Sequence, residues 1–221
     1  MDETRLAVIE EGALCELYCM RPGSENLTGN IYLGRVENVL PGMSAAFVNI
    51  GMKKNGFLSV EDIPAELRSD RALLETLRRS CAKKLARPGA QIVVQAVKSQ
   101  PGAKGPRLSG YVTLPGRLMV LLPDVGYVGV SRKIDDGAER ARLHATGRAL
   151  TVQRGDGIIL RTAAEGATED ELRGEYDRLT AQWLDIKRRA EHVIAPKLLY
   201  DDNDLALKVV RDRLGVQVDA L

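Results

Sequence analysis

Apolar and polar residues alternate along most of the first half of the chain, which is the pattern of half-buried β-strands. Successive side chains of a strand point to opposite faces, so alternation places one set inside a sheet and the other outside. Residues 4–20 alternate on either side of Glu10-Glu11-Gly12, which predicts a β-hairpin. Because a lone two-stranded hairpin is only marginally stable, we expect this one to need a partner elsewhere.

Further strand patterns lie between residues 28 and 110. They occupy residues 29–40, 44–50, 57–60, 91–98 and 106–112. A charged segment with leucines near residues 70–85 interrupts them and predicts a helix. Five strands with one helical insertion predict an OB-type β-barrel.

The only two phenylalanines of the chain fall on the outer side of this barrel pattern. The inward positions of their strands are apolar: Ala46, Val48, Ile50, Leu58 and Val60. Phe47 and Phe57 therefore point outward, where aromatic rings stack on bases of single-stranded nucleic acid for about 1–3 kcal/mol each. The alternative is a barrel that curls the other way and buries both rings, since phenylalanine is usually inside.

The second half of the chain mixes short strands with helices. Strand patterns flank a tight-turn sequence at residues 123–126, and a short helix precedes a strand at 157–161. Thr168 and Glu171 have capping-box spacing, which marks the start of a helix. Apolar residues then step by three and four: Leu172, Tyr176, Leu179, Trp183, Ile186, Ala190 and Val193. This spacing predicts a long helix with one buried stripe, in which Trp183 is structural.

After Ala195-Pro196 the chain is expected to make one more short strand and a helix, Asp201 to Leu214. Residues 215–221 alternate again, which predicts a strand whose partners belong to a longer protein. Asp201, Asp202 and Asp204 precede the helix, where N-capping is the more common role than metal binding.

Composition adds constraints rather than a function. The 221 residues are 44% hydrophobic, which is enough for a real core, and the net charge is +2. Any basic surface for nucleic acid must therefore be local. Cys15, Cys19 and Cys81 form no CxxC pair, and with two histidines they make no convincing four-ligand zinc site. We expect the three cysteines to be reduced thiols, which favours a cytoplasmic protein. The sequence shows no signal peptide and no 18-residue apolar run, so neither export nor a membrane span is expected.

Several segments, taken together, resemble a known family. GRVENVLPGMSAAFVNIGMKKNGFL, GAKGPRLS, TLPGRLMVLLP, VGVSRKI and GIILRTA occur in the order and spacing of the amino-terminal half of the ribonuclease E/G family. The first segment is shared by many S1-type RNA-binding domains. SRKI followed by ILRTA is much more specific, and the resemblance covers almost the whole chain.

The resemblance implies an α+β fold in which an S1-type OB-fold barrel is inserted in a partial ribonuclease-H-like fold and an α/β 5′-sensor subdomain follows. The implied boundaries are residues 1–27 for the first hairpin, 28–110 for the barrel, 111–197 for the 5′ sensor and 198–221 for the return to the ribonuclease-H-like part. The family's deoxyribonuclease-like catalytic subdomain, its Mg²⁺-binding aspartates and its zinc-binding cysteine motif have no match here. Catalytic and metal residues are therefore expected outside this chain, with none in it.

The resemblance also assigns roles to residues. Phe47 and Phe57 match positions that stack single-stranded RNA, and Lys104 matches a basic residue that contacts the RNA backbone. The glycines beside Lys104 allow close approach to a phosphate, although an ordinary solvated loop lysine is an equally simple explanation.

Arg161 and Thr162 match the pair that binds a 5′ phosphate. A guanidinium fork and a hydroxyl suit a dianionic phosphate, and the alternative for Arg161 is an ordinary arginine at a strand end. Gly116 and Val120 match positions around the terminal nucleotide, and Arg132 matches a second sensor arginine. Glu165 departs from the family pattern, and its charge is expected to weaken phosphate capture.

The sequence thus predicts the RNA-binding and 5′-monophosphate-sensing part of a single-strand-specific endoribonuclease of RNA processing and decay. The full-length enzyme is expected to be a homo-oligomeric hydrolase that uses Mg²⁺, whereas this chain alone is expected to bind RNA without cutting it. The alternative is a non-catalytic RNA-binding adaptor or ribosome-associated module.

Overall fold

A computed structural model describes residues 3–20, 27–40, 43–59, 88–98, 104–202, 206, 208 and 209. The helix expected near residues 70–85 and the strand expected within 215–221 lie outside these ranges. Residues 206, 208 and 209 are helical, in agreement with the helix expected there. None of the helices in the described ranges has both the length and the apolarity of a membrane span.

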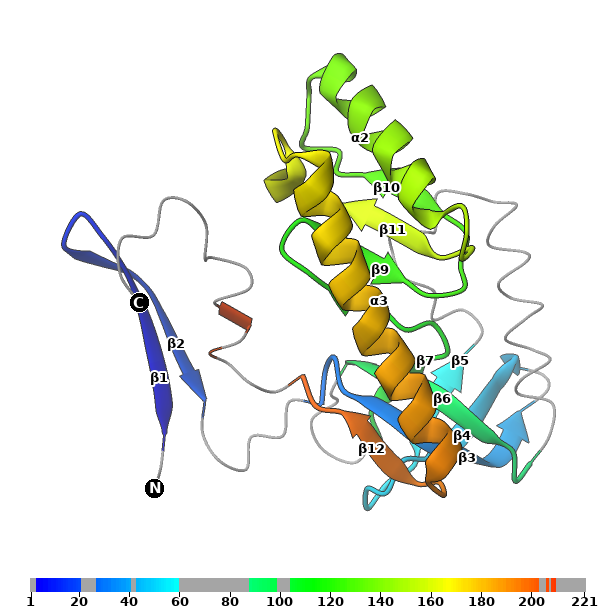
Figure 1. The fold of residues 1–221 in the computed structure, drawn as a ribbon. Helices are drawn as coiled ribbons and strands as arrows, with labels where there is room; N and C mark the ends of the chain where they lie inside the picture. The colour runs from blue at the N-terminus through cyan, green and yellow to red at the C-terminus, as the bar shows by residue number, and fades with distance from the viewer. Residues whose placement is uncertain are drawn as a thin grey trace.

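The predicted hairpin is formed by β1 (Thr4–Glu10) and β2 (Ala13–Met20), which pair antiparallel. Three of its large apolar side chains are more than half exposed: Ile9, Leu14 and Leu17. Figure 1 shows the hairpin, in blue, set apart from the rest of the strands. Its place in a ribonuclease-H-like subdomain stays a prediction.

Five strands close a small barrel, as the sequence predicts. They are β3 (Ile31–Leu40), β4 (Ala45–Asn49), β5 (Gly56–Ser59), β6 (Gln91–Lys98) and β7 (Arg107–Ser109). Their order is β3-β4-β5-β7-β6, and β6 pairs again with β3 to close the barrel. Ala46, Val48 and Leu58 are completely buried within it. The α+β chain therefore contains an OB-like barrel.

The strand expected after Ala195-Pro196 is β12 (Lys197–Tyr200), and its partner is β3 of the barrel. The two strands are antiparallel, with Lys197 opposite Leu33. β12 thus brings the chain that follows the long helix back to the strand where the barrel begins.

A second sheet of four strands lies beyond the barrel. It consists of β8 (Leu114–Pro115), β9 (Met119–Leu122), β10 (Val128–Val130) and β11 (Gly157–Leu160). The order is β10-β11-β9-β8, with β10 parallel to β11 and β9 antiparallel to it. The strands expected on either side of residues 123–126 are both present. They are not neighbours, because β11 lies between them.

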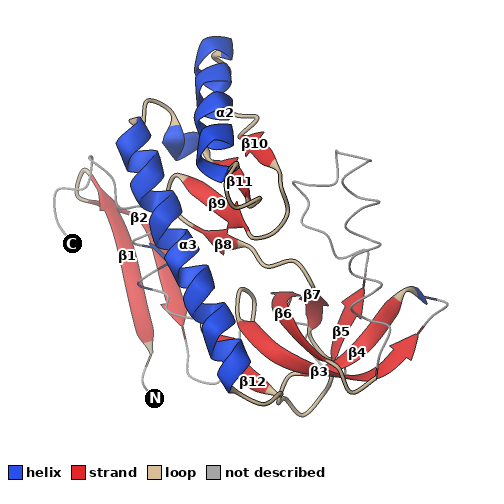
Figure 2. Ribbon diagram, turned by 45° about the vertical axis from the view of Figure 1, so that its right-hand side comes forward, coloured by secondary structure: helices blue, strands red, loops and turns tan. Residues whose placement is uncertain are grey.

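Two helices, α2 (Gly137–Thr151) and α3 (Glu169–His192), pack on one face of this sheet. Leu143 of α2 and Leu179 of α3 share a core with Ile158 and Leu160 of β11. The same core extends along α3 to side chains of β3 and β12, and Figure 2 shows the helix running past both sheets. The predicted stripe of α3 is buried from Leu172 to Ile186, including Trp183 as a structural residue. Ala190 and Val193 are only partly buried, and Val193 follows the end of the helix.

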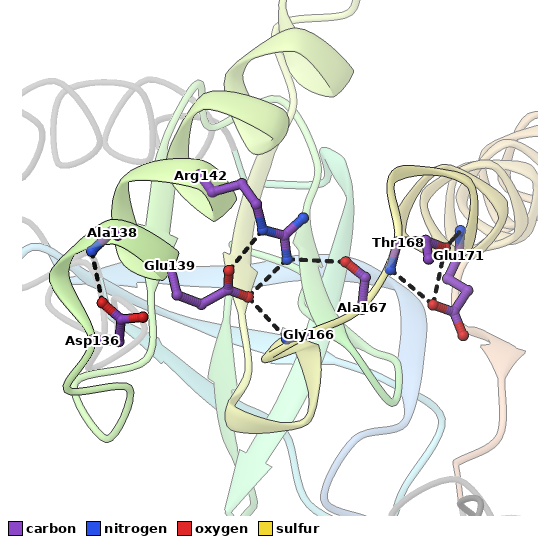
Figure 3. Close-up of polar contacts among 8 residues, drawn as sticks. All are labelled: Asp136, Ala138, Glu139, Arg142, Gly166, Ala167, Thr168 and Glu171. Carbon is purple, nitrogen blue, oxygen red and sulfur yellow. Dashed lines mark hydrogen bonds and ion pairs between the residues drawn. The ribbon is translucent and has the colours of Figure 1, made fainter.

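The loop that joins β11 to α3 is held by hydrogen bonds to both helices (Figure 3). Arg142 of α2 donates two bonds of 2.7 Å to the carboxylate of Glu139 and one of 2.9 Å to the carbonyl of Ala167. Glu139 also accepts a bond of 2.9 Å from the Gly166 amide. At the start of α3 the predicted capping box is present. This network fixes the short helix η3 (Thr162–Ala164), which contains one of the candidate site residues.

We predict that acid destabilises the chain partly through Glu139. Hydrogen bonds from Arg142 and then from Gly166 lower the pKa of this carboxyl from 4.5 to about 2. A carboxyl with a lowered folded-state pKa stabilises the fold above its unfolded pKa, and the stabilisation is lost as the pH falls to the folded value. Glu139→Gln should therefore lower the melting temperature near neutral pH. The difference in melting temperature between this variant and the wild type should shrink as the pH falls from about 5 toward 2.

Thermal melting followed by circular dichroism at a series of pH values measures this difference. The matched control is Glu165→Gln, which removes an exposed carboxylate from the same loop. A difference for Glu139→Gln that stays constant over the acid range would contradict the assignment.

Candidate functional site

The two phenylalanines lie side by side on the outside of the barrel. Phe47 is 37% exposed and Phe57 is partly exposed, so both rings point away from the core and the alternative of two buried rings is wrong. The residues are register partners on β4 and β5, and their rings meet edge to face. The ring centroids are 5.9 Å apart and the angle between the ring planes is 65°. Such a contact holds each ring in place while leaving an aromatic surface open.

Strand register extends this pair into a row across the barrel. Asn38 of β3 lies opposite Phe47, Arg107 of β7 lies beside Phe57, and Lys98 of β6 lies opposite Arg107. Asn38, Arg107 and Lys98 are all exposed. Since register partners share a face of the sheet, the row has two rings in the middle and two cations at one end. We call these five residues the barrel row.

Lys104 is exposed and lies just before the strand that contributes Arg107. Its neighbour Gly105 passes so close to the barrel that an added Cβ would lie 1.9 Å from the carbonyl oxygen of Asn55. Glycine is therefore needed here to let the chain approach β5, which is a structural reason that the sequence did not reveal. The close approach places Lys104 next to the strand of Phe57.

The other candidate residues gather on the second sheet. Along β10 and just past it, Tyr127, Gly129 and Ser131 alternate onto the face opposite the helices. On β11 and past it, Ile159 and Arg161 share that face, and Val120 of β9 is the register partner of Ile159. We call this the open face, since α2 and α3 cover the other one.

A hollow of about 1030 Å³ lies on the open face and continues across the edge strand β10 to α2. Its basic lining residues come from four segments: Arg117, Arg132, Lys133, Arg140, His144 and Arg161. None of the described residues that line it is acidic, and Glu165 is not among them. Five guanidinium or ammonium groups in one hollow favour an anionic ligand, although the whole chain has a charge of only +2.

Gly116 and Arg161 are joined directly. Arg161 Nη1 donates a bond of 2.6 Å to the carbonyl of Gly116. The loop of Gly116 is itself fixed from α3, because the carboxylate of Glu175 accepts bonds of 2.8, 2.6 and 3.1 Å from the amides of Arg117, Leu118 and Met119. A Cβ on Gly116 would lie 2.7 Å from the Glu175 carboxylate, so a larger residue here would displace that carboxylate. Glu175 thus positions the segment against which the arginine rests.

The Thr162 hydroxyl lies 3.1 Å from the hydroxyl of Ser131 at the edge of the hollow. Arg132, the residue after Ser131, is exposed, and Val120 is partly buried on the open face. Arg140 of α2 donates bonds of 2.6 and 3.2 Å to the carbonyls of Ser131 and Ile134, which fixes the turn between them. The structure therefore brings Arg161, Thr162, Gly116, Val120 and Arg132 together, and places Phe47, Phe57 and Lys104 on the barrel.

Sequence reasoning missed several residues of these surfaces. Arg107 and Lys98 stand in the barrel row only through the pairing of β7 with β5 and β6. Tyr127 and Arg140 reach the hollow through the arrangement of β10 and α2. Alternation gives a possible signal for Tyr127, because it is two residues from Gly129 and four from Ser131.

The acidic and cysteine candidates show no metal centre among the residues described. No three His, Cys, Asp or Glu side chains come together there. Asp202 pairs with Lys208 at 3.1 Å, and its amide donates to Asn30. Cys15 and Cys19 are exposed thiols on β2, whereas Cys81 and Asp204 lie outside the described ranges.

Comparison with known proteins identifies relatives along the whole chain. Residues 113–221 match the Ribonuclease E/G family. Ribonuclease G of Haemophilus influenzae is 38% identical over 221 residues, which are 100% of this chain and 45% of the relative. Ribonuclease G of Escherichia coli K12 is 38% identical over 99% of this chain and 45% of its own length. Ribonuclease E of Nostoc is 42% identical over 87% of this chain and 27% of its own length.

The chain thus spans less than half the length of these curated relatives. The match to the family begins at Thr113 and includes both the open face and the loop held by α2 and α3. The similarity to the ribonuclease G sequences also covers the barrel and its row. The chain belongs to the ribonuclease E/G family.

Proposed function

We propose that this chain binds RNA and senses its 5′ monophosphate within a single-strand-specific endoribonuclease of RNA processing and decay. The observation that carries the proposal is the basic hollow in which Arg161, bound to Gly116, lies near the hydroxyls of Thr162 and Ser131. Relatives named ribonuclease G and ribonuclease E support an RNA substrate.

A 5′ monophosphate suits this arrangement chemically. It bears about −1.5 to −2 charge near neutral pH and several acceptor oxygens. A guanidinium fork binds two such oxygens at once, and a nearby hydroxyl supplies a further donor. The bond from Arg161 to Gly116 orients the fork before the ligand arrives, so less conformational entropy is lost on binding. Glu165 is not among the residues that line the hollow, so any effect of its charge on the phosphate acts from outside the lining.

The barrel row is proposed as the surface for the body of the strand. Stacking on Phe47 and Phe57 tolerates any base, while Arg107, Lys98 and Lys104 attract the phosphates. A single strand fits such a surface better than a duplex, whose bases are already stacked.

We assign the chemistry of the whole enzyme to residues outside this chain, with Mg²⁺ activating the water there. In that proposal residues 28–110 are the S1-type barrel and residues 111–197 the 5′ sensor. Residues 1–27 and 198–221 contribute to a ribonuclease-H-like subdomain, and the whole protein is a cytoplasmic homo-oligomer. The isolated 221-residue chain binds RNA without cleaving it.

The first functional prediction concerns the phosphate. The chain should bind a 5′-monophosphorylated oligonucleotide roughly tenfold or more tightly than the same strand with a 5′ hydroxyl, because charge-assisted hydrogen bonds each contribute about 1.5–3 kcal/mol. Arg161→Lys keeps the charge but loses the fork, so it should remove most of the preference, and Thr162→Val should reduce it less. Fluorescence anisotropy titrations measure both affinities.

The control is Arg148→Lys, the same change at an exposed arginine of α2 that does not line the hollow. It should leave the preference intact. Equal affinities of the wild type for the two RNAs, unchanged in Arg161→Lys, would refute the sensor and favour the adaptor interpretation.

The second functional prediction separates stacking from charge on the barrel row. Phe47→Ala should weaken binding of an unstructured RNA by about 1–3 kcal/mol without changing its salt dependence. Arg107→Gln should instead lower the slope of log affinity against log salt concentration by about 0.7, the value for one phosphate contact to a single strand. Affinities measured over a series of salt concentrations distinguish the two effects.

Lys197→Gln is the matched control, since it removes an exposed cation from β12 at the other edge of the same sheet. Its slope should equal that of the wild type. If Arg107→Gln also leaves the slope unchanged, the cationic end of the barrel row does not contact RNA phosphates.

A further inference from the structure

The open face changes from polar to apolar along its strands. At one end lie Ser131 and Arg161, and two residues earlier on the same strands lie Gly129 and Ile159. Gly129 and Ile159 are register partners, and Val120 continues their row on β9. Two residues of a strand span roughly 7 Å, which is the scale that separates the phosphate of a nucleotide from its base. The apolar row therefore lies where the base of a nucleotide would fall if its phosphate were at Arg161.

Tyr127 completes this apolar end. An added Cβ on Gly129 would lie 2.8 Å from Cε1 of Tyr127, 3.3 Å from its hydroxyl oxygen and 3.4 Å from Cζ. The ring is thus folded down onto the backbone of Gly129, and any larger residue there would displace it. Tyr127 packs against buried Leu122 and Val125, yet it still lines the hollow. This position gives the hollow one fixed aromatic ring.

The size of the hollow also exceeds what a phosphate needs. Its volume of about 1030 Å³ is at the upper end of the range of about 300–1,000 Å³ typical of pockets for drug-sized ligands. Ligand sites of this kind combine a few polar groups with a larger apolar or aromatic wall. Here the polar groups are at Arg161 and Thr162, and the wall is formed by Tyr127, Ile159 and Val120.

We propose that Tyr127 is the stacking platform for the base of the 5′-terminal nucleotide, with Ile159 and Val120 as the floor of its subsite. The inference rests on the proposed function, because it requires an RNA 5′ end held at Arg161. Stacking tolerates every base, so the subsite does not select a sequence. It favours purines over pyrimidines, since a larger ring covers more of the tyrosine.

The test compares two 5′-monophosphorylated oligonucleotides that differ only in the first residue, adenosine in one and an abasic ribose in the other. Wild-type protein should bind the adenosine strand about 5- to 150-fold more tightly, the range for one stacked base. Tyr127→Ala should bring this ratio close to one while keeping the preference for 5′ phosphate over 5′ hydroxyl. Tyr127→Phe keeps the ring and should behave like the wild type.

Two further variants guard against a purely structural effect. Gly129→Ala leaves Tyr127 in the sequence but displaces its ring, and should also lower the adenosine-to-abasic ratio. Tyr18→Ala removes an equal ring from the hairpin β1–β2 and should change nothing. In the wild type, 2-aminopurine at the 5′ position should lose fluorescence on binding, and Tyr127→Ala should restore it. This readout needs no comparison of variant stabilities.

A ratio near one in the wild type, or a ratio that Tyr127→Ala leaves unchanged, would overturn the proposal. Failure of the proposed function gives a different pattern, in which the wild type does not distinguish 5′ phosphate from 5′ hydroxyl. A third pattern is a preference for the adenosine strand over the abasic strand with no preference for 5′ phosphate over 5′ hydroxyl. That result would refute the 5′ sensor but support Tyr127 as a stacking residue.

Discussion

The packing of one helix against two sheets is the constraint on which the rest of this structure depends. α3 buries a stripe of side chains along its 24 residues, and the core they enter contains residues of β9, β11, β3 and β12. Each large apolar side chain buried in this way contributes about 1.5–3 kcal/mol. The barrel and the second sheet are therefore not independent units joined by a linker. Their relative placement is fixed because α3 packs against both of them, and Figure 2 shows both sheets along the length of this helix.

The same helix also orients the candidate site through a polar contact. Glu175 is on α3, and its carboxylate binds three consecutive amides of the loop after Gly116. The carbonyl of Gly116 then receives the guanidinium of Arg161. A rotation or shift of α3 would move the carboxylate, the loop and the arginine together. If the barrel row and the hollow bind one RNA strand, this rigid connection raises the effective concentration of the second site once the first is occupied.

Local features of the sequence predicted much of the fold. The alternation of residues 4–20, the inward Ala46 and Val48, and the capping box at Thr168 all depend on side chains only a few residues apart. The outward direction of Phe47 followed from the same alternation. Matching segments then pointed to the family. These signals are short-range, and the structure preserves them because the local preferences agree with the tertiary packing.

The missing information was mostly about which strands are neighbours. The sequence around residues 123–126 marks a turn, but nothing local says that β11, some thirty residues later, lies between the strands on either side. The parallel pairing of β7 with β5 places Arg107 beside Phe57 in the same non-local way. Gly129 illustrates the point most clearly, since a side chain there would displace the ring of Tyr127 that is folded over it. Alternation assigns both residues to one face but does not fix the rotamer that brings the ring over the glycine.

The loop after Arg161 shows why several distant contacts are needed to build a small anion site. Thr162 is exposed at the start of a three-residue 3₁₀ helix, which has too few hydrogen bonds to hold a hydroxyl in one place. The remaining restraint comes from α2, where Arg142 and Glu139 bind Ala167 and Gly166, and from the capping box that begins α3. Glu139 therefore serves the site although it lies outside the lining of the hollow. A charged pair that contributes little on an open surface becomes important here because it orders the backbone that presents the hydroxyl.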